Sequence, residues 1–160
     1  CQTGAQVGAD VRFCLSGGTK LWKGIGEQIS SLPQLPDCFL VACKPPVGVD
    51  TRAAFSRIDQ KPGKYSPCTD RMCRALGTGN LEQIAGCMGN QFESALELSE
   101  VSMLKQQMLE YGAVGACMTG SGSVVFGLFR KEGEASRCLE SVSNGENQAF
   151  ICRPYFGKME

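Results

Sequence analysis

Histidine is absent from all 160 residues, which excludes every catalytic arrangement that uses an imidazole base within the chain. Net charge is absent too: sixteen basic and sixteen acidic side chains cancel, so the broad positive surface of a general nucleic-acid-binding protein is excluded. No apolar run is long enough for a membrane span, and residues 1–10 lack the basic and apolar regions of a signal peptide. We therefore expect a cytoplasmic globular protein.

Cysteine, by contrast, is frequent, with ten residues. No C-x-x-C pair occurs, and no histidine is present to complete a mixed zinc site. Most of the cysteines stand in apolar runs such as VRFCL, DCFLVAC and FIC, where a free thiol behaves as a small hydrophobic side chain. We expect reduced, mostly buried thiols and no metal ligand. Disulfides or an iron–sulfur site are the alternatives.

From residue 38 onward the pattern alternates strands and helices. The apolar run CFLVACK at 38–44 predicts a central strand. Further strands are expected at 111–118, 124–129 and 148–154, and helices at 51–59, 69–77, 80–88, 90–111 and 132–142. This order favours an α+β fold, a ferredoxin-like antiparallel sheet with helices on one face.

The helix ends carry their own signals. Asp50 or Thr51 can cap the first helix, Thr69 the second and Asn90 the long one, because their side-chain oxygens accept from free backbone N–H groups. Along the long helix Val101, Leu104, Met108 and Tyr111 share one apolar face.

Residues 1–35 do not belong obviously to that unit. A strand is expected at 11–15 and two more on either side of the turn at 24–26, and the proline-containing loop LPQLPD at 32–37 follows them. We interpret residues 1–35 as the trailing segment of another domain and residues 36–160 as a second one.

Three stretches could carry chemistry. MTGSGSVVFGLF at 118–129 holds three glycines beside a strand, and backbone N–H groups in such a turn can bind an anion. It lacks the lysine of a P-loop and the third glycine of a dinucleotide fingerprint. PPVGVDTRAAF at 45–55 and Asp10 are the other two. Taken singly, each also fits a plain turn, loop or helix cap.

Taken together, three stretches occur in the order found in one enzyme family. GADVRFCLSGGTKLWKGIGEQI at 8–29, VACKPPVGVDTRAAFSRID at 41–59 and GAVGACMTGSGSVVFGLF at 112–129 resemble the GHMP small-molecule kinases. The resemblance covers nearly the whole chain, but only the later half of such an enzyme. Arg12 stands where the family commonly has proline, and Ser123 and Val124 replace its usual proline and threonine.

The resemblance implies an activity and residue roles. It is closest to the members that use ATP and Mg²⁺ to phosphorylate the 2-hydroxyl of a cytidine diphosphate-linked sugar alcohol in non-mevalonate isoprenoid biosynthesis. Asp10 would be the base or would orient the acceptor hydroxyl. The other matching residues are Ile25, Thr51 and Phe55 at the substrate and Gly120, Ser121 and Gly122 near the phosphates.

The same resemblance gives the two segments their names. Residues 1–35 would end the catalytic nucleotide-binding domain, and residues 36–160 would be the C-terminal substrate domain. Because the family's upstream nucleotide loop is not among these residues, we expect the 160 residues alone to be inactive, with the N-terminal half of the enzyme as their partner. The alternatives are a stand-alone small-molecule-binding module, another GHMP kinase such as homoserine or mevalonate kinase, and a redox or metal protein.

Overall fold

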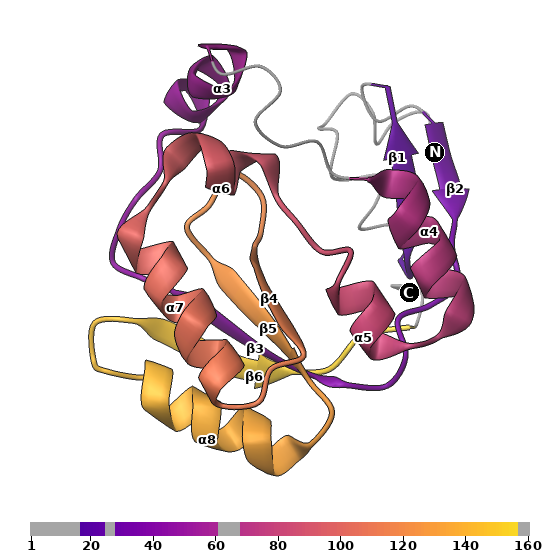
Figure 1. Cartoon of the computed structure of the whole chain (residues 1–160). Coiled ribbons are helices and arrows are strands. Elements are labelled where there is room, and N and C mark those ends of the chain that lie inside the picture. The colour runs from indigo at the N-terminus through magenta and orange to yellow at the C-terminus, as the bar shows by residue number, and fades with distance from the viewer. Residues whose placement is uncertain (1–16, 25–27, 61–67, 157–160) are drawn as a thin grey trace.

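The computed structural model describes residues 17–24, 28–60 and 68–156 (Figure 1). The strands are β1 Lys20–Lys23, β2 Gln28–Ser31, β3 Phe39–Lys44, β4 Gly115–Met118, β5 Val125–Phe129 and β6 Gln148–Cys152. The helices are α3 Thr51–Gln60, α4 Thr69–Thr78, α5 Leu81–Ala85, α6 Gln91–Leu96, α7 Ser99–Glu110 and α8 Glu132–Val142. None of the described helices is long and apolar enough to cross a bilayer.

Four of the described strands form one sheet in the order β4-β5-β3-β6, with every neighbouring pair antiparallel. β3 is internal as predicted, because Val41 pairs with Gly127 on one side and Ile151 on the other. The chain order of strand, helices, two strands, helix and strand is the ferredoxin-like βαββαβ arrangement. The predicted fold class is confirmed.

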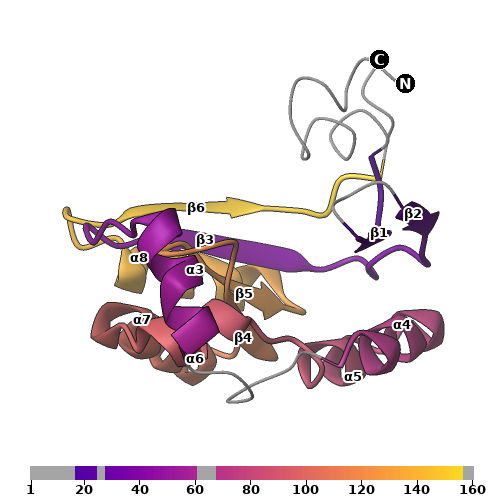
Figure 2. The same ribbon diagram turned by 90° about the horizontal axis from the view of Figure 1, so that it is seen from above.

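The core lies between helices α7 and α8 and this sheet, whose strands β6 and β3 run side by side in Figure 2. Because side chains alternate along a strand, Val41 and Cys43 of β3 both point to the face that meets these helices. The α7 side chains Val101, Leu104 and Met108 pack against them. These three residues confirm the predicted apolar face of the helix, whereas Tyr111 is 38% exposed and does not belong to it.

Helix α8 follows its prediction closely. Ala135, Cys138 and Val142 are buried on one side of it, at the spacing of one helical face. On the opposite side of the sheet, Leu81 of α5 packs with Leu128 in a smaller cluster. Helix α5 therefore covers part of the second face, whereas the sequence predicted helices on one face only.

Strands β1 and β2 form a separate antiparallel hairpin, which confirms the two strands predicted there. The chain then runs through residues 32–38, where Leu32 and Leu35 pack against α4 and α5. These contacts join residues before position 36 to helices after it. The domain boundary between residues 35 and 36 stays a prediction.

Two helix-end predictions are wrong. Thr69 is the first residue of α4 and does not cap it; Cys68 holds the cap position and its side chain makes no capping bond. The long helix predicted from Asn90 to Tyr111 is two helices, because Glu97 adopts a left-handed backbone with φ of 51° and its N–H bonds to Glu93 O, which ends α6. The chain changes direction there, and α7 begins on the new course (Figure 1).

The described cysteines divide by burial. Of the eight, Cys38, Cys43, Cys117 and Cys138 are buried, Cys73 and Cys87 are half-buried, and Cys68 and Cys152 are exposed. Burial raises the pKa of Cys38 and of Cys138 to about 11, so these thiols stay protonated and unreactive at neutral pH. The expectation of burial holds for the thiols in the core but not for Cys68 and Cys152.

Candidate functional site

The N-terminus of α3 shows why Thr51 is available for binding. Asp50 caps the helix: its Oδ1 accepts from Arg52 N at 2.8 Å and from Ala53 N at 3.1 Å. Of the two caps that the sequence allows, the structure therefore uses Asp50. The Thr51 hydroxyl is left to make a tertiary contact.

That contact is a hydrogen bond of 2.9 Å between Thr51 Oγ1 and Ser121 Oγ, two residues 70 positions apart. It joins the start of α3 to the glycine-rich turn at 119–123 between β4 and β5. Both hydroxyls lie near the surface, where a ligand can reach them. Thr51 and Ser121, which the sequence assigned to one site, are thus brought together by the fold.

Phe55 lies one helical turn beyond Thr51 and is 56% exposed. Its ring packs edge-to-face against Phe92 of α6, with the ring centroids 5.0 Å apart and the planes at 85°. This contact fixes the orientation of the Phe55 ring, while its exposure leaves surface on which a planar group could stack.

The glycine-rich turn requires glycine at two positions. Gly120 and Gly122 have φ of 59° and 100°, a region that side chains other than glycine rarely adopt. A Cβ on Gly122 would lie 2.8 Å from Met118 Sδ and 3.3 Å from Val49 Cγ2. The turn is therefore packed closely against the 45–50 loop at Gly122.

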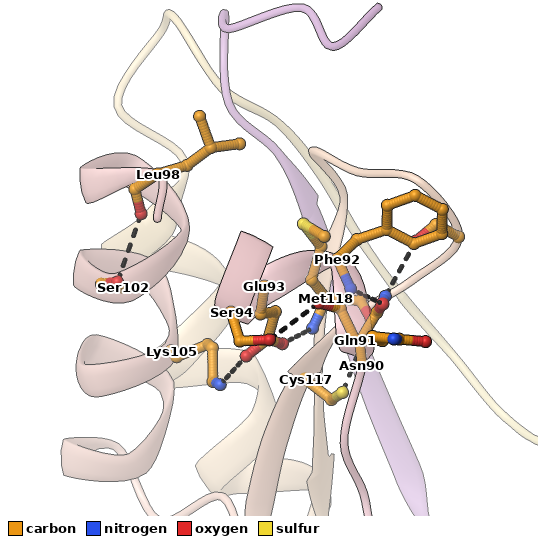
Figure 3. Close-up of polar contacts among 11 residues, drawn as sticks. Asn90, Gln91, Phe92, Glu93, Ser94, Leu98, Ser102, Lys105, Cys117 and Met118 are labelled. Carbon is orange, nitrogen blue, oxygen red and sulfur yellow. Dashed lines mark hydrogen bonds and ion pairs between the residues drawn. The ribbon is translucent and has the colours of Figure 1, made fainter. Parts of the chain in front are cut away.

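Two side chains hold the turn from its sides. Asn90 Nδ2 donates to Met118 O and to Gly120 O, each at 2.8 Å (Figure 3). Ser123, which is 2% exposed, donates from Oγ to Val47 O at 2.6 Å. The serine that replaces the family's proline thus ties the turn to the 45–50 loop through a buried hydrogen bond.

The sequence indicated Asn90 only as a helix cap, and that prediction is confirmed, since its Oδ1 accepts from Phe92 N at 2.9 Å. It did not indicate Glu93 or Lys105. Glu93 accepts a hydrogen bond from Met118 N and forms an ion pair with Lys105 of α7. These residues line a pocket of about 430 Å³ between α6 and α7. The N-x-x-E spacing of Asn90 and Glu93 was the available signal, but it reads as a capping box.

Two predicted site residues, Asp10 and Ile25, lie outside the described residues. Among the residues that are described, no group of three or more histidine, cysteine, aspartate or glutamate side chains could hold a metal ion. The described part of the site therefore offers hydroxyls, a close-packed glycine turn and an aromatic ring.

The comparisons with known proteins agree on one group. Residues 72–147 match the family profile described as GHMP kinases C terminal. The 4-diphosphocytidyl-2-C-methyl-D-erythritol kinase of Clostridium tetani is 36% identical over 152 residues, which are 94% of this chain and 54% of that protein. The protein of the same name from Lachnospira eligens is 39% identical over 139 residues, 86% of this chain and 48% of that protein. The chain spans about half the length of the curated relatives it matches.

Two solved structures with a similar fold are kinases as well. A crystal structure of 4-(cytidine 5'-diphospho)-2C-methyl-D-erythritol kinase superposes with a TM-score of 0.77 at 25% identity, covering 96% of this chain and 56% of that one. Homoserine kinase from Cytophaga hutchinsonii superposes with a TM-score of 0.73 at 19% identity, covering 92% of this chain and 51% of that one. The second likeness shows the fold alone.

Proposed function

We propose that this chain belongs to the GHMP kinases and is the C-terminal part of a 4-diphosphocytidyl-2-C-methyl-D-erythritol kinase, because residues 72–147 match the profile of that family's C-terminal domain and relatives of that name are 36% and 39% identical. The complete enzyme transfers the γ-phosphoryl group of ATP to the 2-hydroxyl of the cytidine diphosphate-linked sugar alcohol. The names of the relatives support this substrate in preference to homoserine or mevalonate.

One observation carries the proposal: the hydrogen bond between Thr51 and Ser121, which places the KPPVGVDT segment against the glycine-rich turn. A substrate that lies along α3 would therefore have one end beside Phe55 and the other end beside the glycine-rich turn. A ligand with a pyrimidine ring at one end and a phosphate acceptor at the other has the matching chemistry.

The proposed roles follow from side-chain chemistry. Phe55 stacks on the cytosine ring, while Thr51 and Ile25 contact the rest of the substrate. Gly120, Ser121 and Gly122 form the wall near the phosphates, where backbone N–H groups of a tight turn suit anions. Asp10 accepts the proton of the attacking hydroxyl or orients it.

Mg²⁺ would enter with ATP, bound by the phosphates. No described residue of this chain is assigned a role in binding it. Nothing in the proposed roles of the described residues depends on it.

The test of this function is a substrate comparison with the complete enzyme that contains the chain. We expect ATP-dependent phosphorylation of the diphosphocytidyl alcohol, with kcat/KM at least about a hundredfold above that for homoserine or mevalonate, because loss of a stacked base alone costs about 1–3 kcal/mol and further contacts add to it. Phosphorylation of homoserine or mevalonate instead would move the protein to another branch of the family. Tight binding of the alcohol without turnover would favour the stand-alone binding module.

The substitution Phe55→Ala tests the stacking role. We expect KM for the diphosphocytidyl alcohol to rise about tenfold while kcat changes little, because stacking acts equally in the ground state and the transition state. The matched control is Phe150→Ala, which removes a ring of similar exposure on β6, 58% against 56% for Phe55. Steady-state kinetics measure both. An equal KM in the two variants would remove Phe55 from the cytidine site.

A further inference from the structure

The last residue of β4 has two backbone groups that the sheet does not satisfy. β4 is the edge strand of its sheet, and Thr119 N donates toward β5, to Val124 O at 2.8 Å. Pairing alternates along an antiparallel strand, so the N–H and C=O of the preceding residue, Met118, point away from β5. Met118 is 2% exposed, and buried backbone groups need partners.

Helix α6 supplies these partners with side chains in place of a fifth strand. Asn90 Nδ2 donates to Met118 O, and Glu93 Oε1 accepts from Met118 N. Asn90 caps the helix and Glu93 lies three residues on, a spacing that puts both side chains on one side of α6. Figure 3 shows both of them directed at the end of β4.

The second oxygen of Glu93 is also used. It pairs with the Lys105 ammonium of α7, and the side chains of Glu93 and Lys105 are only 19% and 29% exposed. The ion pair thus holds the carboxylate between two helices while its other oxygen holds β4. Both carboxylate oxygens are fixed by the fold.

Besides burial, the Glu93 carboxylate also raises the pKa of a nearby thiol, that of Cys117. The pKa of Cys117 is raised to about 12, first by burial and then by the Glu93 carboxylate, and the Lys105 charge opposes this rise. The negative charge of Glu93 is therefore close to the end of β4.

We propose that Glu93, oriented by Lys105 and assisted by Asn90, is a positioning residue that fixes the glycine-rich turn for phosphoryl transfer. The step from β4 to the turn is short: Met118 immediately precedes residues 119–123, and Asn90 also bonds Gly120 O within the turn. This inference rests on the proposed kinase function only for its kinetic consequence.

The kinetic test compares four forms of the complete enzyme: wild type, Glu93→Ala, Glu93→Gln and Glu82→Ala. In Glu93→Ala we expect kcat/KM for ATP to fall about ten- to a hundredfold, because displacing a reacting group by about 1 Å costs up to a hundredfold. Glu93→Gln keeps an oxygen that can accept from Met118 N and should recover most of this loss. Glu82→Ala is the matched control, because it breaks an exposed ion pair with Arg130 and neither residue belongs to the turn at 119–123.

A merely structural role would act on stability and leave kcat/KM of the folded enzyme unchanged. A kcat/KM for ATP that is unchanged in Glu93→Ala, once activity is corrected for the folded fraction, would therefore overturn the positioning role.

Amide hydrogen exchange of residues 119–124 gives a readout that does not need activity. We expect faster exchange there in Glu93→Ala than in wild type or Glu82→Ala, with Glu93→Gln close to wild type. Equal exchange in all four forms would overturn the inference whatever the kinetics. Faster exchange in a protein that does not phosphorylate the alcohol would support the hold on the turn and refute the proposed function.

Discussion

In the complete enzyme, Asp10→Asn is expected to lower kcat by about 10²–10⁴ while the substrate KM changes much less. Asparagine keeps the size of the side chain and much of its hydrogen bonding, but it cannot take a proton from the acceptor hydroxyl. Steady-state kinetics with varied ATP and varied alcohol separate the two effects. Asp10 lies outside the described residues, so its role depends on the GADV match at 8–11.

The size of the loss also distinguishes two roles for this carboxylate. Phosphoryl transfer needs little proton removal early in a loose transition state, so a group that only orients the hydroxyl should give a loss near about 10². Asp37→Asn makes the same chemical change at an exposed carboxylate, 3.7 Å from Arg153, and should leave kcat close to wild type. An unchanged kcat in Asp10→Asn would reduce the GADV match to a plain turn.

The sequence correctly predicted the elements in which burial of the side chains follows one regular pattern from end to end. β3 is a continuous apolar run because Val41 and Cys43 pack against α7 and α8 while Leu40 packs on the other side of the sheet. Helix α8 shows one apolar face because it lies on the sheet. Both patterns are set by burial alone, so local periodicity is enough to find them. Their places in the sheet followed from the order of elements.

The break between α6 and α7 was not predictable in this way. Glutamate is a good helix former, and nothing local at Glu97 signals its left-handed backbone. The break follows from two tertiary demands: α6 must bring Asn90 to the glycine-rich turn, while α7 must place Val101 against the sheet. One straight helix would not place both Asn90 and Val101 at these contacts.

The site shows the same limit. Thr51 and Ser121 were assigned to one site through a family resemblance, and only the fold shows that their hydroxyls meet at 2.9 Å. Glu93 and Lys105 were missed because their partner is the backbone N–H of Met118, and a backbone group carries no signature in the sequence. Side chains that support a turn through its main chain are therefore found only by tracing hydrogen bonds.

Gly122→Ala is expected to destabilise the protein by about 2–4 kcal/mol, the sum of backbone strain and overpacking. Its φ of 100° is unfavourable for any residue with a Cβ, and the new methyl carbon would lie 2.8 Å from Met118 Sδ. Met118 is fully packed and cannot move away without disturbing the end of β4. Thermal unfolding measures the loss.

Gly120→Ala separates strain from close packing, because Gly120 has φ of 59° and a Cβ added there would meet nothing within 4 Å. We expect it to lose only about 1–2 kcal/mol, the cost of a left-handed residue. In the complete enzyme, kcat/KM for ATP should fall about ten- to a hundredfold in Gly122→Ala, since the shift reaches the wall proposed to lie near the phosphates, and clearly less in Gly120→Ala. If the two variants lost equal stability and equal activity, contact with Met118 would not be what holds the turn, and the close packing at Gly122 would have no part in function.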